Sequence, residues 1–320
     1  MNRQTWFSTL VLLTMLAVPW VLRAAEPAPP PASPAASTQV PDQAAAPAAA
    51  TTGSPRWPGP HLGLRRLAAV DVQGAYNPLG IQVLGSLVLR NVYEVDQKRN
   101  IEWAYLQAGL GILLNPAYAQ VSVHMEWAPA AFLTLRFDTA LFGYFGVLGA
   151  LRQFDSFPEK SDVDRNASSL PGHDRTGFAY RVMLQPTLAL QQGWFIFRNQ
   201  CNIAMYRFVG RGAYFYEYEN DTVMAPTELL IYNQLWVLAQ VWKAKRDATL
   251  MIGALYDVTY TAVTDLRRQR VGGLFLWQPK DPWGPLDRLR IYVMAGVILE
   301  DRNRKYEPFV AGGFGTDFDL

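Results

Sequence analysis

The stretch YAQVSVHMEW, Tyr118–Trp127, alternates between apolar and polar residues. Its apolar residues are Ala119, Val121, Val123, Met125 and Trp127. The residues between them are Gln120, Ser122, His124 and Glu126. A period of two is the side-chain period of a β-strand, whose residues point alternately to opposite faces of a sheet. One face of this strand is therefore apolar, and the fold depends on whether a protein core or lipid covers that face.

The same alternation recurs along much of the chain. It is found in Phe178–Gln191, Thr249–Thr261 and Leu289–Glu300, and again in the stretches LGIQVLGSLVLRN and FLTLRFDTALF. Several of these segments run past ten residues, whereas an ordinary strand has about five or six. The longer segments match the about 9 to 11 residues that a tilted strand needs to cross a bilayer.

The composition favours lipid over a protein core. Charged residues make up 18% of the 320 residues, and average soluble domains carry about 25%. The polar face holds Gln, Ser, Asn, Gly and a few charges, where a soluble sandwich would present Lys, Glu and Thr. Aromatic residues stand at segment ends, as in an interfacial girdle. They are Trp103, Trp127, Trp194, Tyr260 and Trp277.

The remaining composition excludes several function classes. A net charge of +2 gives no reason to expect a nucleic-acid partner. The single cysteine, Cys201, excludes an intramolecular disulfide and a cysteine-based metal cage. The three histidines are too scattered to indicate a zinc site by spacing, and we expect neither a metal nor a cofactor.

The N-terminus has the pattern of an exported protein. Arg3 precedes an apolar run, and LRAAEP supplies a small-residue exit, so we expect a signal peptide over residues 1–25. Residues 26–61 are almost entirely Ala, Pro, Ser, Thr and Gln, which predicts a disordered linker. The folded domain is expected over residues 62–320, and no stretch in it is long and apolar enough for a transmembrane helix.

We predict that this domain is all-β, a transmembrane antiparallel up-and-down β-barrel of about 12 strands. The expected crossings are 65–76, 79–93, 101–114, 118–127, 131–144, 177–190, 193–217, 228–243, 248–262, 268–278, 287–300 and 306–320. Two alternatives stay open. The segment 193–217 changes phase and is either one bulged strand or two short ones. The segment 65–76 is either a strand or a small plug inside the barrel.

An even number of crossings returns the last strand to the periplasm, where bacterial barrels begin and end. The short connections at 127–131, 190–194 and 243–247 then lie on the periplasmic side. The long connections at 151–177 and 219–228 lie outside, in agreement with the rule of short periplasmic turns and longer external loops.

The end of the chain, YEPFVAGGFGTDFDL, carries a more specific signal. Gly315 is followed by hydrophobic residues at alternate positions, and Phe314, Phe318 and Leu320 share one face. This pattern resembles the C-terminal β-signal of bacterial outer-membrane barrels, although the usual last residue is Phe or Trp. The resemblance implies location in the bacterial outer membrane, contact with its lipid and lipopolysaccharide, and recognition by the barrel-assembly machinery. It indicates no specific family and no oligomeric state.

The polar face supplies candidate residues that line the lumen. These candidates are Gln120, Ser122, His124, Glu126, Arg136, Asp138, Arg181, Arg198, Asp257, Arg290, Glu300, Asp317 and Asp319. One interpretation is a set of interior ion pairs that fills a small barrel, and the other is a lining that selects solutes by charge. Several glycines are expected to leave space there. They are Gly109, Gly111, Gly253, Gly296, Gly313 and Gly315.

Three functions follow from this pattern. The leading hypothesis is a non-enzymatic barrel that acts as a small-solute channel or as a structural membrane protein. The second is a lipid-modifying hydrolase that uses Ser122 and His124, because some outer-membrane phospholipases pair His and Ser two apart on a strand. Here the order is reversed and both residues are expected to face the lumen, so a hydrogen-bonded lumen histidine is the simpler interpretation. The third is an adhesin or assembly partner that works through its external loops.

Overall fold

The computed structural model describes residues 62–76, 80–96, 101–146, 151–158, 173–174, 176–210, 212–217, 219–243, 248–279, 289–302 and 304–320. The expected signal peptide (1–25) and linker (26–61) lie outside the described residues. No helix long and apolar enough to cross a membrane occurs among the residues that the structure describes.

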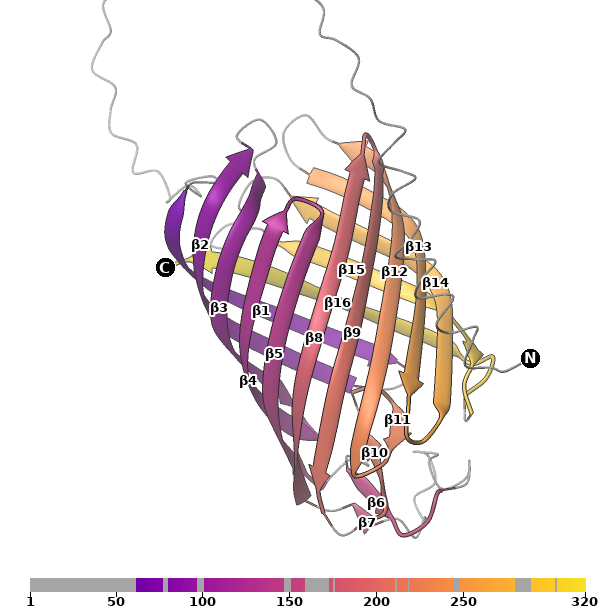
Figure 1. Cartoon of the computed structure of the whole chain (residues 1–320). Coiled ribbons are helices and arrows are strands. Elements are labelled where there is room, and N and C mark those ends of the chain that lie inside the picture. Colours follow the sequence, from indigo (N-terminus) through magenta and orange to yellow (C-terminus); the bar gives the residue numbers. More distant parts are fainter. Residues whose placement is uncertain are drawn as a thin grey trace, which may run out of the picture. The chain divides into compact units, whose positions relative to one another are not determined.

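Twelve strands form one closed barrel, as the alternation predicted (Figure 1). In chain order they are β1 (Gly63–Tyr76), β2 (Gly80–Asp96), β3 (Ile101–Asn115), β4 (Tyr118–Ala130), β5 (Leu133–Phe145), β8 (Thr176–Gln192), β9 (Phe195–Val209), β12 (Thr227–Lys243), β13 (Ala248–Thr261), β14 (Leu266–Pro279), β15 (Arg290–Glu300) and β16 (Pro308–Asp319). Each strand pairs antiparallel with the barrel strands before and after it in the chain, and β1 pairs with β16.

The exposed face of each strand is apolar and the buried face carries the polar groups. In β4, Val121, Val123 and Met125 are about half exposed, at 54%, 50% and 53%, whereas Ser122 and His124 between them are buried. A barrel in water would show the opposite pattern. The apolar outer surface needs lipid to cover it, so the chain forms a transmembrane barrel of the bacterial outer-membrane type.

The expected aromatic girdle divides between the two ends of the barrel. Trp127 and Trp194 are exposed at one end, where Trp277 also lies close to the end of β14. Tyr260 lies near the opposite end, as the next-to-last residue of β13. The side chain of Trp103 lies outside the described part.

The first segment is a barrel strand and not a plug. β1 pairs over its length with both β2 and β16. The backbone amide of Leu320 also donates a hydrogen bond to the carbonyl oxygen of Arg66, at 3.0 Å. The two ends of the folded domain therefore meet and close the barrel, which excludes the plug alternative for 65–76.

The segment predicted as one crossing over 193–217 contains two strands of different sheets. β9 ends at Val209, and β10 (Tyr214–Glu217) belongs to a second, four-stranded sheet with β6 (Arg152–Phe154), β7 (His173–Asp174) and β11 (Thr222–Met224). Of the two alternatives for this segment, the structure therefore shows two strands, and only β9 crosses as part of the barrel. The chain leaves the barrel near Gly210 and Gly212, where a Cβ atom would come within 3.0 Å of neighbouring groups.

The two ends of the barrel differ in their connections. We call the end where β1 begins and β16 ends the terminal rim; it also carries the tight turns at 131–132 and 193–194. The opposite end, the loop rim, carries the connections 146–175, 210–226, 262–265 and 301–307. In Figure 1 the small sheet of β6, β7, β10 and β11 lies at the loop rim. The two longest connections, 146–175 and 210–226, therefore share one rim, as predicted.

We expect the loop rim to face the cell exterior, since outer-membrane barrels place long loops outside. Two single-cysteine variants test this, Ser156→Cys at the loop rim and Ala131→Cys at the terminal rim, each with Cys201→Ser. Both positions are exposed. A membrane-impermeant maleimide should label the first in intact cells and the second only after the outer membrane is permeabilised. The reverse pattern would invert the orientation.

Candidate functional site

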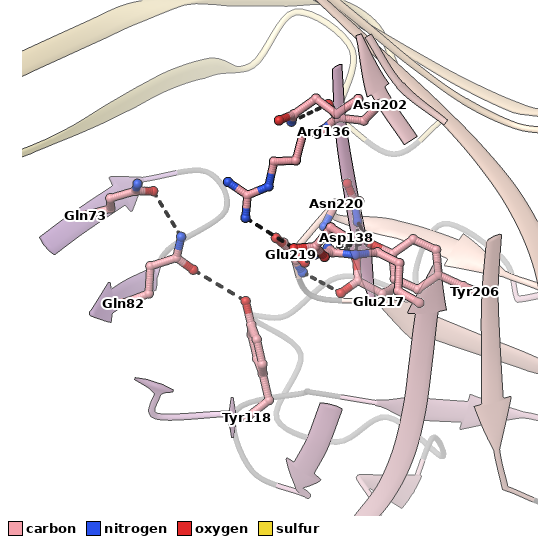
Figure 2. A network of polar contacts seen from close by, with 12 residues as sticks. Gln73, Gln82, Tyr118, Arg136, Asp138, Asn202, Tyr206, Glu217, Glu219 and Asn220 are labelled. Atoms are coloured by element: carbon pink, nitrogen blue, oxygen red, sulfur yellow. Dashed lines mark hydrogen bonds and ion pairs between the residues drawn. The ribbon is translucent and has the colours of Figure 1, made fainter. Parts of the chain in front are cut away.

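A chain of alternating charges on the inner face of the barrel reaches the connection between β10 and β11 (Figure 2). Arg136 Nη2 lies 3.2 Å from Asp138 Oδ2, and Arg181 Nη2 lies 3.1 Å from Asp138 Oδ1. The other Arg181 nitrogen, Nη1, lies 3.2 Å from Glu219 Oε2 and donates to the hydroxyl of Tyr206 at 3.3 Å. Because Arg181 and Asp138 are both buried, each charge needs the other, and the network fixes β5 against β8.

Glu219 does not belong to the barrel wall. It lies between β10 and β11, and we call this hairpin, residues 214–224, the lid. Next to it, Asn220 Nδ2 donates to the Tyr206 hydroxyl at 3.1 Å. Two apolar lid residues, Phe215 and Met224, are fully buried in a cluster with inner-face aromatic residues. These cluster members are Tyr118, Phe142, Tyr144, Tyr206 and Phe208. The lid therefore contacts the interior of the barrel and not only its rim.

A second acidic residue holds the other side of the lid. Asp221 has a left-handed backbone with φ of 50°, and its carboxylate is buried. Its Oδ2 lies 3.2 Å from Arg304 Nε in the β15–β16 connection and 3.7 Å from Arg268 Nη1 on β14. Its Oδ1 accepts a hydrogen bond from the Tyr216 hydroxyl. Since β8 and β14 are separated by three strands in the barrel, the lid is tied to two separate parts of the wall.

A third acidic residue of the lid, Glu217, is buried and accepts hydrogen bonds from within the turn. The donors are the backbone amides of Glu219 (2.9 Å) and Asn220 (2.6 Å) and the Asn220 side chain (2.9 Å). Burial, and next the charge of Glu219, raise the pKa of Glu217 to about 7. The closed lid binds this proton more tightly than an open lid, in which the pKa returns to about 4.5. Through Glu217, the closed lid therefore gains stability as the pH falls from about 7 to 4.5.

The candidates from the sequence lie on the inner face with one exception. The buried ones are Gln120, Ser122, His124, Asp138, Arg181 and Asp257. The partly exposed ones are Glu126, Arg136, Arg198, Arg290 and Asp317. Nothing is described of the Asp319 side chain. The structure brings Arg136, Asp138 and Arg181 into one network, and it places Asp257 against Arg270 at 2.9 Å.

Glu300 is the exception. A β-bulge between Gln269 and Arg270 shifts the register, so that Glu300 lies opposite Gln269 and Ile298 opposite Arg270. The Glu300 side chain is half exposed, lies 3.5 Å from Arg267 and accepts a hydrogen bond from Gln269. It therefore belongs to the outer side of the loop rim, and its assignment to the lumen is wrong because strict alternation does not continue through a bulge.

The glycines do not leave open space. A Cβ at Gly253, Gly296 or Gly313 would collide with a carbonyl oxygen of the neighbouring strand. At Gly109 the space is occupied by the ring of His124, and at Gly111 by the Ser122 hydroxyl. These positions therefore allow backbones and side chains to approach closely, which is the opposite of the predicted effect.

Gly315 has a specific role at the closure of the barrel. A Cβ there would collide with the carboxylate of Asp71 on β1. Arg290 Nη2 of β15 lies 3.6 Å from that carboxylate and 3.3 Å from Asp317 Oδ1 of β16. One arginine therefore ties three strands across the seam where the barrel closes. Of the other residues in the C-terminal signal, Phe314 and Leu320 are exposed.

Ser122 and His124 lie on the inner face, with no hydrogen bond between them in the described part. Both are buried, and His124 Nδ1 has no hydrogen-bond partner among the described residues. His124 lies opposite Asp138 in the β4–β5 register, beside the charge network.

Most of the amides on the inner face and all the acidic residues of the lid were not among the residues predicted from the sequence. Gln73 and Gln82 pair at 3.0 Å, and Gln185 donates to Asn202 at 2.8 Å (Figure 2). The amides follow from the same period of two that selected the charges. The lid residues Glu217, Glu219 and Asp221 carry no periodic signal, because they belong to a loop.

We expect Asp221→Asn to loosen the lid, because it leaves Arg268 and Arg304 without their shared carboxylate. Breaking a buried pair costs about 3–5 kcal/mol, and about 3 kcal/mol would make opening roughly a hundredfold more frequent. Hydrogen exchange at the amides of Phe215 and Met224 measures this opening. The control is Asp265→Asn, which changes another left-handed Asp in an exposed turn. Equal exchange in both variants would contradict the role of Asp221.

No protein-family model matches this chain, and no curated protein matches it in sequence. Among solved structures, the chain is similar to the β domain of the Bordetella autotransporter BrkA (11% identity, 79% of this chain and 99% of that one, TM-score 0.42). It is also similar to an outer-membrane channel from Pseudomonas putida F1 (10%, 83% and 100%, TM-score 0.41). A third is LpxR from Salmonella typhimurium (10%, 78% and 99%, TM-score 0.33). All three are outer-membrane proteins of different kinds, and at these scores no activity follows from the likeness.

Proposed function

We propose that this protein is a non-enzymatic channel for small solutes, and that the lid restricts access to it from the loop rim. The observation that supports the proposal is the partial exposure of charged side chains on the inner face. The exposed fraction is 30% for Arg136, 40% for Arg290, 26% for Asp71 and 21% for Asp317. Solvent reaches these groups, whereas a barrel filled by its own side chains would enclose them.

Most of the charges on the inner face are paired with a charge of opposite sign. The carboxylates of the barrel wall have partners: Asp138 and Asp257 meet arginines, and Glu126 accepts a hydrogen bond from Tyr105 at 2.6 Å. Arg198 has no carboxylate within ion-pair distance among the described residues; its described partners are Gln200 and Trp236. The Tyr105 hydroxyl is neutral, so Glu126, like Arg198, is not in an ion pair among the described residues. Glu126 and Arg198 therefore leave one charge of each sign for passing ions to meet.

We also infer two partners from the surface. The exposed Phe314 and Leu320 at the end of β16 suit recognition by the barrel-assembly machinery. Arg267, which is 44% exposed at the loop rim, suits contact with the acidic groups of lipopolysaccharide.

Planar-bilayer recording tests the channel. We expect conductance steps, and the reversal potential of wild type in a KCl gradient is the reference for the variants. The double variant Arg136→Gln/Arg290→Gln removes two solvent-reached positive charges and should shift the preference toward cations. Arg267→Gln, on the outer side of the loop rim, is the matched control and should leave it unchanged.

A closed lid is separated from a blocked barrel by the Asp221→Asn variant, which should raise the frequency of open events. If wild type and Asp221→Asn both give no conductance after folding is verified by heat-modifiable migration, the channel proposal fails. The structural or loop-binding role then replaces it.

A further inference from the structure

Part of the inner face is apolar. These side chains form no ion pairs and do not contact lipid, so neither interaction explains why they are apolar. Leu238, Met251 and Leu274 are buried there, on β12, β13 and β14. Other residues pack against them and are themselves only partly buried. These are Ile196, Trp236, Leu276, Tyr292 and Met294. We call these eight residues the inner apolar patch; Trp236 and Met294 also join it to a second cluster around Leu255.

Arg198 lies at the border between this patch and the polar part of the inner face. Its guanidinium carbon lies 4.5 Å from the centre of the Trp236 ring, and its Nη2 donates to Gln200 Oε1 at 2.6 Å. The ring and the amide hold the planar group in one orientation. Of its five N–H donors, one is used in this hydrogen bond, and the remaining edge has no carboxylate partner among the described residues.

On its other side, Arg198 lies opposite Ala189 in the β8–β9 pairing. Ala189 is a small residue on the inner face with an exposed side chain, and Gln191 further along β8 is also exposed. On the patch side, the indole Nε1 of Trp236 is buried and has no hydrogen-bond acceptor in the described part. The guanidinium of Arg198 therefore lies beside an apolar surface and opposite a small, exposed residue, while the N–H of Trp236 is enclosed next to it.

We propose that Arg198, Trp236 and the inner apolar patch form a binding site for an organic carboxylate with an apolar body. The planar guanidinium matches a carboxylate in a bidentate geometry, and the patch would cover the apolar body of the same solute. An inorganic anion would use the arginine and leave the patch uncovered, and a neutral apolar molecule would leave the arginine without an anion. The site deepens the proposed channel, on which its role in transport rests.

A second arginine with a similar support provides a matched control. Arg90 lies over the ring of Tyr105 at 4.6 Å, and its Nε donates to Gln107 at 2.7 Å. Arg90 therefore has the same stacked and hydrogen-bonded arrangement as Arg198. It lies on β2, away from the strands of the inner apolar patch, and does not belong to that patch.

Titration calorimetry of the full-length barrel with benzoate tests the proposal, with benzyl alcohol and acetate as the neutral and the small probe. Benzoate should bind more tightly than both. Arg198→Gln should weaken benzoate binding about tenfold or more, as expected for a lost charge-assisted hydrogen bond. Arg90→Gln should bind benzoate like wild type.

Two further variants keep the test decisive if Arg198→Gln does not fold. Arg198→Lys keeps the charge but not the planar fork and should bind benzoate with reduced affinity. Ala189→Phe places a large side chain opposite Arg198 and should weaken benzoate binding without changing any charge. Equal benzoate affinity in these variants and wild type, or benzyl alcohol binding as tightly as benzoate, would overturn the site.

The outcomes for the site and for the channel are separable. Conductance without benzoate binding removes the site and leaves the channel. Benzoate binding that depends on Arg198 without conductance in wild type or Asp221→Asn removes the channel and leaves a binding barrel.

Discussion

Lipid offers no hydrogen-bond partner to the backbone, and the structure depends on this constraint. A sheet in a bilayer must close on itself, because an open edge would leave a row of N–H and C=O groups unpaired. The pairing of β1 with β16 meets this requirement, down to the hydrogen bond from Leu320 to Arg66. Gly315 then leaves room for the Asp71–Arg290 pair at the same seam. The last residues of the chain are therefore part of the closure.

The same constraint places the polar chemistry inside. Once the outer face is apolar, each charged side chain on the inner face must find a partner, water or a solute. Most of the charges near the loop rim are paired, and Arg181 shares its guanidinium between the wall and the lid. Toward the terminal rim, Arg290 is paired with Asp71 and Asp317, whereas Arg198 rests on a ring and an amide. The inner face thus combines closed charge networks with one arginine that has donors to offer.

The sequence was sufficient for the parts of the fold that follow a period of two. The number of crossings and the inward position of His124 follow from alternation and strand length, whereas the sequence left 65–76 open between a strand and a plug. It was insufficient where alternation stops. The bulge at Gln269 and Arg270 turns the Glu300 side chain from the inner to the outer face. After Val209 the chain leaves the barrel and forms a strand of the second sheet. Neither event changes the composition locally.

The lid and the inner apolar patch were beyond sequence analysis for a different reason. Asp221 has a structural role because it pairs with Arg268 and Arg304. These residues are distant in the sequence and lie next to Asp221 only in the folded barrel. Leu238 and Leu274 look like ordinary strand residues, and only the register shows that they share the inner face with Trp236. The prediction that the glycines leave space in the lumen was wrong, because the space at a glycine depends on how closely the neighbouring strand approaches.

The most direct test of the central claim is a nitroxide scan along β4 in liposomes, with single cysteines from Gln120 to Trp127 introduced beside Cys201→Ser. Collision with oxygen, which concentrates in lipid, and with a water-soluble nickel chelate is measured at each site. The account predicts a period of two, with oxygen collisions highest at Val121, Val123 and Met125. Maxima at Ser122 and His124, or no period at all, would contradict a barrel with lipid on that face.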